Sequence, residues 1–514
     1  MRLSKQTLSE IPRTSGVKLP DPKVFGFPEK ILQFGTGVFI RGLIDYFIDK
    51  ANNEGKFGGR VVMVKSTDAG DLKDFTKQEG LYTLLMKSVE EGQELEEKVI
   101  CASVSRVLSA VDQWQEVLKC AANPEMKIIF SNTTEIGIVL VEEDKTDARP
   151  PASFPGKLLA FLHERYKVFD GSADSGMVIV PTELIPGNGT KLKSIVHQLA
   201  VLNKMDEPFI HWLDTANDFC NSLVDRIVPG RLPDAEHKQT EKLLGYTDEL
   251  MIMSETFGLW AIETSSPRTR GLLSFSDAHP GIHLVEDIEK FRELKLRLLN
   301  GSHNLSCALG YIAGFQTVKE AMANPHFDRY MRRLILDEIA SSILSDKITM
   351  EDAHQFGSKV LDRYRNPHIN FEWLSICVQD TSKIRIRAVP IAVQHHQKYG
   401  RVPDCISLGF AAYMLFMKSE KSTDGQYTGH ANGRTYTIQD DFAENLFQKW
   451  KSASGLQLVE AVLADRQLWD TDLSKLNGFA DSVNFYLDNL SQNGFVHTVE
   501  LAYRTKETAV QINP

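Results

Sequence analysis

The chain has 514 residues, more than a single hydrophobic core usually supports, so the sequence predicts two domains or one large domain with an appendage. Its 42% hydrophobic and 25% charged residues are typical of a globular protein and exclude a disordered or fibrous chain. The formal net charge of −10 argues against a broad phosphate-neutralising surface, so nucleic acid is not an expected partner.

The 6 cysteines are scattered along the chain without a Cys-x-x-Cys pair or a Cys/His cluster. This pattern predicts free thiols in a reducing compartment and no metal site. The segment from Met1 to Pro20 lacks the apolar stretch of a signal peptide, and no later run approaches the length of a membrane span. We therefore expect a cytoplasmic protein without membrane contact, either a monomer or a small homo-oligomer.

Residues 1–286 contain short apolar runs that alternate with helical patterns. The runs are residues 31–34, 61–64, 127–130 and 177–180. Such alternation predicts parallel strands with crossover helices, and hence an α/β Rossmann-type domain. Between residues 80 and 110, two apolar stretches flank an acidic turn, which predicts an antiparallel insertion.

The first apolar run leads into a glycine-containing turn and then a helix. The first glycine permits a tight turn, the second lets the backbone approach a pyrophosphate, and the helix N-terminus supplies free amide groups. Ile40 stands where a third glycine is usual, so a plain strand-to-helix turn is the alternative. The candidate cofactor-binding residues are Gly35, Thr36, Gly37, Val38, Phe39 and Arg41.

Two later strand ends carry further candidate cofactor contacts. Asp68 could accept hydrogen bonds from the adenosine ribose, which favours NAD over NADP. Its spacing is longer than usual, it could merely cap a turn, and nearby Lys65 leaves room for a ribose phosphate. Asn132 lies in a polar turn where the nicotinamide ribose would sit, although an ordinary polar turn would look the same.

Residues 287–514 show long helical periodicity, which predicts a mostly α-helical C-terminal domain. Ligand pockets favour domain interfaces, and doubly wound sheets bind ligands at the carboxyl ends of their strands. We therefore expect the ligand in a cleft between the two domains.

A polar set opens this second domain on an otherwise apolar helical segment. On an ideal α-helix, His303 would lie about 80° and Asn300 about 140° from Lys295, so all three could border one cleft. Polar groups in such a segment require partners. The alternative is that Lys295 extends to solvent and Asn300 caps a helix.

Farther along, Lys383, Arg385 and Arg387 alternate with apolar residues in period two. An extended chain would project all three cations to one side, where they could meet a substrate carboxylate. A solvated charged face would show the same pattern.

Four motifs follow one another in a fixed order. They are G-x-G-x-F-x-R at residues 35–41, Asn188-Gly189 after a strand, V-D-R-I at residues 224–227, and K-x(4)-N-x-x-H at residues 295–303. Together they resemble the polyol-specific long-chain dehydrogenases and reductases, the mannitol dehydrogenase family. The resemblance runs over nearly the whole chain.

This resemblance implies a metal-free ketone reduction with NAD as cofactor. Hydride arriving at a ketone carbon leaves negative charge on oxygen, which amide donors stabilise and a lysine neutralises with a proton. The implied residues are Lys295 as acid and base, Asn188 and Asn300 as oxyanion donors, His303 as an orienting group, and Lys383 and Asp225 as substrate contacts. Lys383 would pair with the carboxylate of an acid.

Four segments most resemble the branch of the family that acts on sugar acids, namely residues 131–137, 181–185, 219–228 and 439–441. Arg292 stands where the mannitol branch has a glutamate. The resemblance thus implies reversible, NAD(H)-dependent reduction of a keto-hexuronate, a step of hexuronate catabolism. The alternatives are an epimeric keto-uronate or a polyol as substrate, and a nucleotide-binding sensor that has lost catalysis.

Overall fold

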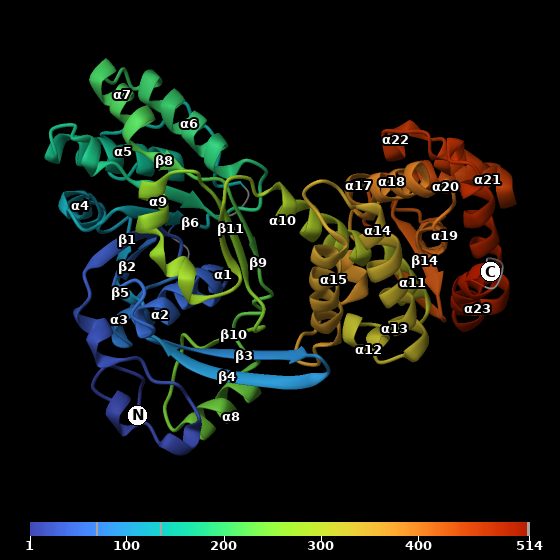
Figure 1. The fold of residues 1–514 in the computed structure, drawn as a ribbon, viewed down its shortest axis with the longest axis horizontal. Helices are drawn as coiled ribbons and strands as arrows, with labels where there is room; N and C mark the ends of the chain where they lie inside the picture. Colours follow the sequence, from blue (N-terminus) through green and yellow to red (C-terminus); the bar gives the residue numbers. More distant parts are fainter. Residues whose placement is uncertain (68–69, 134–135, 511–514) are drawn as a thin grey trace. The chain divides into compact units, whose positions relative to one another are not determined.

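The computed structural model describes residues 1–67, 70–133 and 136–510 (Figure 1). The chain divides into two compact units. The first comprises residues 1–88 and 95–288, and the second residues 89–94 and 289–514.

The first unit is built on a six-stranded parallel sheet of order β5-β2-β1-β6-β7-β8. Its strands are β1 (Glu29–Phe34), β2 (Arg60–Lys65), β5 (Val104–Ser109), β6 (Ile128–Ser131), β7 (Val178–Pro181) and β8 (Asp218–Phe219). Numbered along the chain within this sheet, the order is 3-2-1-4-5-6, that of the Rossmann fold. The predicted α/β Rossmann-type architecture is confirmed.

Alternate side chains along the central strands pack into two separate hydrophobic cores, one on each face of the sheet. Ile31 and Val61 pack into one cluster, and their neighbours Leu32 and Val62 into the other. Because both faces are covered, the central parts of the strands are mainly apolar rather than alternating, although the buried Gln33 of β1 is polar. The first cluster lies against α1 (Val38–Ile40) and α2 (Tyr46–Asn53). The second lies against α4 (Trp114–Lys119), α5 (Phe154–Val168), α6 (Asn188–Leu202) and α7 (Glu207–Ala216).

The segment expected to form an antiparallel insertion is divided between a hairpin and the main sheet. The strands β3 (Tyr82–Glu90) and β4 (Gln93–Cys101) are neighbours joined by a turn at Glu91 and Gly92, whose positive φ values of 51° and 80° suit a tight hairpin. The next strand, β5, belongs to the main sheet instead. The expected insertion of residues 80–110 was therefore too long.

Smaller elements complete the first unit. They are α3 (Lys73–Lys77), β9 (Ser222–Asp225), α8 (Asp234–Leu244), β10 (Ile252–Ser254), β11 (Leu259–Glu263), α9 (Pro267–Leu272) and β12 (Ile282–Val285). β10 extends the hairpin sheet alongside β3, and β9, β11 and β12 form a third sheet.

The second unit is mostly helical, as predicted. Its helices are α10 (Glu289–Leu294), α11 (Ser302–Ile312), α12 (Val318–Met322), α13 (Pro325–Arg332), α14 (Ala340–Ser342), α15 (Met350–Arg365), α16 (Trp373–Ile376), α17 (Asp380–Arg387), α18 (Val389–Tyr399), α19 (Asp404–Phe416), α20 (Ala443–Ser452), α21 (Gly455–Leu463), α22 (Arg466–Trp469) and α23 (Phe479–Val510). A small sheet contains β13 (Glu420–Lys421), β14 (Tyr427–Ala431) and β15 (Arg434–Thr437).

Helix α19 is the centre of this unit. It is apolar on all sides, and Leu408, Phe410, Tyr413 and Met414 are completely buried in one continuous core. Over the described ranges, no helix has both the length and the apolar character needed to cross a membrane.

Three helical stretches are π-helical, namely Arg41–Asp45, Lys295–Gly301 and Arg333–Ile339. The first follows the glycine turn, and the second contains Lys295 and Asn300. Because a π turn contains more residues than an α turn, the angles predicted for an ideal α-helix between Lys295, Asn300 and His303 do not apply. Such segments are frequent at functional sites.

Both units contain buried carboxyl groups whose pKa is shifted upward, among them Asp248 in the first unit. Burial raises the pKa of Asp45 and Asp49 in the first unit, and of Glu338 and Asp380 in the second, to about 7. Asp45 accepts a hydrogen bond from Gln33 Nε2 at 3.1 Å. Its pKa rises because desolvation outweighs this bond and the nearby charge of Arg41.

Replacing Asp45 with Asn should remove part of the pH dependence of stability. A carboxyl whose pKa rises on folding from 3.8 to about 7 favours the folded state fully below pH 4, and this contribution is lost as the pH rises through 7. We expect Asp45→Asn to flatten the fall in unfolding free energy between pH 4 and pH 7 by up to roughly 4 kcal/mol. Urea unfolding across this range measures the slope, and an unchanged slope would contradict the assignment.

Candidate active site

The turn after β1 contacts the turn after β6. Gly35 has a φ of 129°, and a Cβ built there would lie 2.8 Å from the carbonyl oxygen of Asn132. The Asn132 amide donates to Phe34 O at 2.9 Å. Only glycine fits this position. The two turns meet where the strand order reverses, which is where open α/β sheets bind their ligands.

Gly37 begins the helical stretch that follows and has a different environment. A Cβ there would meet no atom of the described residues within 4 Å. Gly37 and Val38 are exposed, Thr36 is half-buried, and the half-buried Phe39 packs against the core. The first-turn amides of a helix have no carbonyl partner within the helix. An open glycine at such a turn fits the approach of a dinucleotide pyrophosphate.

Arg41 has an interior role that the sequence did not predict. Its Nη1 donates to Leu250 O at 2.8 Å, and its guanidinium lies over the rings of Phe75 and Tyr82. The side chain is 6% exposed. These contacts make Arg41 a packing residue that supports the turn, and the predicted direct contact with the cofactor finds no support in them.

Gly42 has the close-packing role that the third glycine of the motif usually has. Ile40 is completely buried in the core. Two residues later, a Cβ at Gly42 would lie 2.8 Å from Val228 Cγ1. Close packing of this helical stretch thus depends on Gly42 rather than on a glycine at position 40.

A polar network joins the carboxyl ends of β6 and β7. Asn132 Nδ2 donates to Thr182 Oγ1 at 3.0 Å. The buried carboxylate of Glu183 accepts from the Ser131 hydroxyl at 3.0 Å and from the Thr133 amide at 2.9 Å. Glu183 was not predicted from the sequence, where its only signal is an acid shortly after an apolar strand. Asp68, the predicted ribose contact, lies outside the described residues.

Asn188, at the start of α6, has a fully engaged amide group. Its Nδ2 donates to the carbonyls of Pro181, Glu183 and Ser222 at 3.0–3.1 Å, and its Oδ1 accepts from the amides of Gly189 and Ser222. It is 1% exposed. An oxyanion-donor role therefore stays a prediction, and it would require one of these bonds to be exchanged for a bond to substrate.

Asp225 ends β9 and is buried, opposite Leu259 of β11. The next residue, Arg226, donates to the carbonyls of Glu255 and Gly42. This arginine fixes the chain that follows Asp225 against the helical stretch after the glycine turn.

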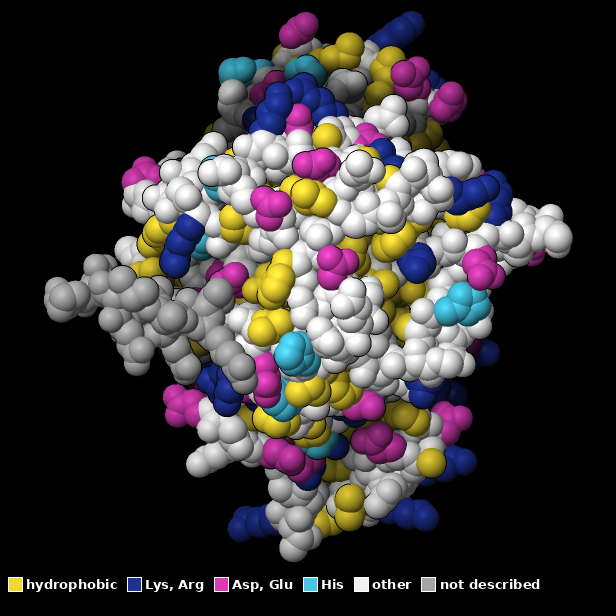
Figure 2. Space-filling view, turned by 90° about the vertical axis from the view of Figure 1, so that its right-hand side faces the viewer, with side chains coloured by type: hydrophobic (Ala, Val, Ile, Leu, Met, Phe, Trp, Pro, Cys, Tyr) yellow, Lys and Arg dark blue, Asp and Glu magenta, His cyan; other side chains and the backbone are white. Residues whose placement is uncertain are grey.

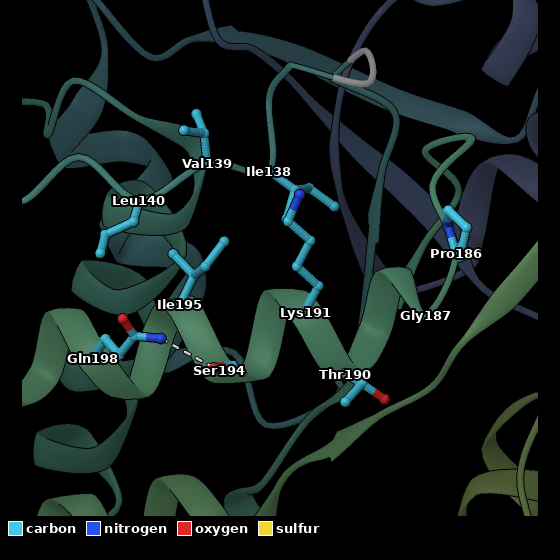
Figure 3. Close-up of a pocket in the computed structure, with 10 residues that line it drawn as sticks. All are labelled: Ile138, Val139, Leu140, Pro186, Gly187, Thr190, Lys191, Ser194, Ile195 and Gln198. Carbon is cyan, nitrogen blue, oxygen red and sulfur yellow. Dashed lines mark hydrogen bonds between the residues drawn. The ribbon is translucent and has the colours of Figure 1, made fainter. Parts of the chain in front are cut away.

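A hollow of about 690 Å³ lies between α6 and residues 138–140 (Figure 3). Its lining is mainly apolar, and Lys191 extends from α6 toward Ile138. None of the predicted cofactor residues that the structure describes lines it. This surface could not be predicted from the sequence, because its apolar side chains resemble ordinary core residues.

In the second unit, the segment Lys295–Gly301 continues directly into α11. Lys295 and Asn300 are half-buried, and His303 is 8% exposed. The His303 ring stacks on Tyr364 with centroids 4.3 Å apart. Since Tyr364 OH donates to Leu299 O at 2.8 Å, the stacking partner is itself fixed. The three predicted residues thus lie on one ordered stretch whose histidine has a defined ring orientation.

Two arginines near Lys295 are paired. Arg292 Nη1 lies 2.7 Å from Glu289 Oε2. Arg297 Nε lies 2.9 Å from Glu293 Oε2, and its Nη1 donates to the carbonyls of Ile386 and Arg387. Arg297 thereby connects the π-helical segment to the end of α17.

The prediction of an extended chain at Lys383 to Arg387 was wrong, because these residues form the end of helix α17. On an α-helix Lys383 and Arg387 lie about 40° apart, whereas Arg385 lies about 160° from Lys383. Arg385 accordingly binds Leu468 O at 2.6 Å and lies over the Phe442 ring. Lys383 Nζ donates to Ile376 O at 3.0 Å.

Charges of both signs are mixed on the surface that Figure 2 shows. Lys and Arg side chains lie scattered there among Asp and Glu, and the described side chains on this face form no broad basic patch. An anionic substrate on this face would depend on individual, locally placed cations.

Comparison with known proteins gives the family. The chain matches the Mannitol dehydrogenase Rossmann domain over residues 29–272 and the Mannitol dehydrogenase C-terminal domain over residues 287–491. The chain belongs to the mannitol dehydrogenase family. This confirms the family that the four sequence motifs indicated.

Curated relatives within the mannitol dehydrogenase family extend over almost the whole chain. Altronate oxidoreductase of Bacillus subtilis (strain 168) is 36% identical, with 92% of this chain and 95% of the relative covered. Altronate oxidoreductase of Shigella flexneri is 34% identical, with 92% and 96% covered.

Two solved structures of dehydrogenases have the same fold. Pseudomonas fluorescens mannitol 2-dehydrogenase, in a ternary complex with NAD and D-mannitol, is 23% identical and aligns with a TM-score of 0.67 over 98% of this chain and 100% of that one. Substrate-free D-sorbitol dehydrogenase is 19% identical and aligns with a TM-score of 0.78 over 97% and 100%.

The two glycines of the turn should respond differently to alanine. Gly35→Ala forces a Cβ against Asn132 O at a positive φ, so we expect a lower melting temperature and strongly weakened NADH binding. In Gly37→Ala the added Cβ meets no described atom within 4 Å, so the melting temperature should stay unchanged while NADH affinity falls at least tenfold. Fluorescence titration with NADH and thermal unfolding measure both effects. Unchanged NADH affinity in Gly37→Ala would contradict a pyrophosphate site at this turn.

Proposed function

We propose that the chain is an NAD-dependent oxidoreductase that interconverts D-tagaturonate and D-altronate. The observation that carries this proposal is the 34–36% identity to altronate oxidoreductases over more than nine-tenths of both chains. The oxidised partner of altronate is a keto-uronate, so the substrate pair is a sugar acid and its ketone. This reaction belongs to hexuronate catabolism.

The first unit supplies the cofactor site. Gly35 and Gly37 shape the turn, and the exposed backbone from Gly37 to Val38 is suited to hold a pyrophosphate. NAD supplies the hydride acceptor or donor when bound. Asn132 and the carboxylate-centred network around Glu183 fix the neighbouring turn. Selection of NAD over NADP by Asp68 stays a prediction.

The second unit supplies the proton. In the reductive direction Lys295 donates a proton to the oxygen of the former ketone, and in the oxidative direction it accepts the hydroxyl proton. Asn300 donates an amide hydrogen to this oxygen while it carries negative charge. His303, held by its stacking on Tyr364, orients the substrate or the lysine. Asp225 and Lys383 remain predicted substrate contacts.

A panel of substrates tests the proposed function. The purified chain should oxidise NADH with D-tagaturonate and reduce NAD with D-altronate, and it should do so with kcat/KM well above that for D-fructuronate, D-mannitol or D-fructose. Absorbance of NADH at 340 nm follows each reaction, with NADPH in parallel. A preference for a polyol would replace the sugar-acid assignment, and turnover of no substrate would indicate the nucleotide-binding sensor.

Lys295→Ala should reduce kcat by several orders of magnitude and leave NADH binding nearly unchanged, because the lysine transfers a proton and does not belong to the nucleotide turn. Lys290→Ala is the matched control, since Lys290 lies on the preceding helix and pairs with Asp352 at 2.7 Å. Its turnover should stay close to that of the wild type. Near-normal kcat in Lys295→Ala would refute the assigned role.

A further inference from the structure

Arg387 lies beside the segment that carries the proposed catalytic residues. Its carbonyl oxygen accepts a hydrogen bond from Arg297 at 3.1 Å and lies 3.3 Å from where a Cβ at Gly301 would stand. Its side-chain Nη1 donates to Asn304 Oδ1 at 2.9 Å. Both its backbone and its guanidinium therefore contact residues that directly follow Asn300 and His303.

A buried bridge holds this guanidinium in place. Asn304 is completely buried, and both the oxygen and the nitrogen of its side-chain amide form hydrogen bonds. The oxygen accepts from Arg387, while Nδ2 donates to Asp380 Oδ1 at 2.6 Å. Cys307 Sγ donates to the other oxygen, Asp380 Oδ2, at 3.3 Å. Because donor and acceptor partners are fixed, the amide can take only one orientation.

Most of the hydrogen-bonding capacity of Arg387 remains open. A guanidinium has five N–H donors, and the single bond to Asn304 uses one of them. Within the described part of the chain, the other donors of Arg387 have no acceptor. The side chain is half-buried, so the edge formed by Nε and Nη2 can reach a ligand. That edge matches the two oxygens of a carboxylate.

The other cations near this segment are more heavily committed. Arg297 and Arg385 bind backbone carbonyls, and Arg297 also pairs with Glu293. Lys383 is a point charge that already donates to Ile376 O. A lysine at that place can bind a hydroxyl or a carboxylate, whereas an arginine held at Nη1 presents a planar fork.

We propose that Arg387 binds the carboxylate of the sugar-acid substrate and makes the enzyme prefer acids over neutral sugars. The proposal rests on the proposed function and deepens it. Asn304 and Asp380 are positioning residues, which act by holding the guanidinium. Burial raises the pKa of Asp380 to about 7, above the ordinary range of an aspartate.

The test compares D-tagaturonate with D-tagatose, which carries a CH2OH group in place of the carboxylate. Arg387→Gln should raise KM for D-tagaturonate by about tenfold to a hundredfold, as expected for loss of charge-assisted hydrogen bonds, and change KM for D-tagatose by less than threefold. Arg387→Lys should recover part of the loss because it restores the charge without the fork. Arg385→Gln should lower the melting temperature and leave the ratio of the two KM values unchanged.

Binding without turnover provides a second measurement. D-Altronate titrated into the enzyme saturated with NADH forms a complex that cannot react, and calorimetry gives its Kd. Arg387→Gln should weaken this Kd by the same factor, and Asn304→Ala, which keeps the charge but removes its holder, should weaken it less.

Each outcome has a distinct meaning. Failure of the wild-type enzyme to reduce D-tagaturonate would overturn the proposed function itself. If the wild type is active, an unchanged KM for D-tagaturonate in Arg387→Gln would overturn only the role of Arg387. An equal rise in KM for both substrates would show a structural role. A selective rise in Lys383→Met without one in Arg387→Gln would assign the carboxylate to Lys383.

Discussion

A buried polar group must find its partner inside the protein, and this requirement determines which side chains around the candidate site remain available to a ligand. Asn188 and Arg41 occupy positions that a motif would assign to chemistry, yet their donors meet backbone carbonyls, as do those of Arg226. Each holds together segments that are distant in the sequence. Removing any of these side chains would leave buried backbone carbonyls without a hydrogen-bond partner and so destabilise the fold.

The glycine turn is held in place on one side and open on the other. Its rigidity comes from Gly35, where the backbone presses against Asn132, and from Arg41, which fixes the helical stretch behind it. Its openness comes from Gly37, where an added Cβ would meet no described atom within 4 Å. A binding loop preorganised in this way loses little entropy when a ligand arrives.

The architecture of the first unit could be predicted because parallel strands covered on both faces leave a simple record of apolar runs. The glycine turn followed from the same record. The helical second unit was equally visible in its periodicity. What the sequence could not show was local helical geometry. Neither the π-helical segment at Lys295 nor helix α17 follows from residue spacing alone, because a short run of alternating charges satisfies both a strand and a helix.

The hydrogen-bond partners of the buried polar groups could also not be predicted from the sequence. Glu183 became visible as the centre of a network only when β6 and β7 were side by side. Arg387 and Arg385 are indistinguishable in an alternating run of charges. In the helix, Arg385 contacts Leu468 and Phe442, whereas Arg387 donates to Asn304. The difference between a structural and a ligand-binding arginine is thus a matter of which acceptors the fold brings to it.

Long-range and short-range electrostatics act in opposite directions here. A chain with a net charge of −10 repels a uronate and a dinucleotide at distance, but salt screens this repulsion beyond roughly 8 Å at physiological ionic strength. Closer in, the balance depends on individual groups. Arg292 and Arg297 pair with Glu289 and Glu293, whereas Asp380, which Asn304 links to Arg387, is buried and has a raised pKa. The proposed role of Arg387 depends on this difference, because an acidic protein can bind an acid only through a cation that is placed locally.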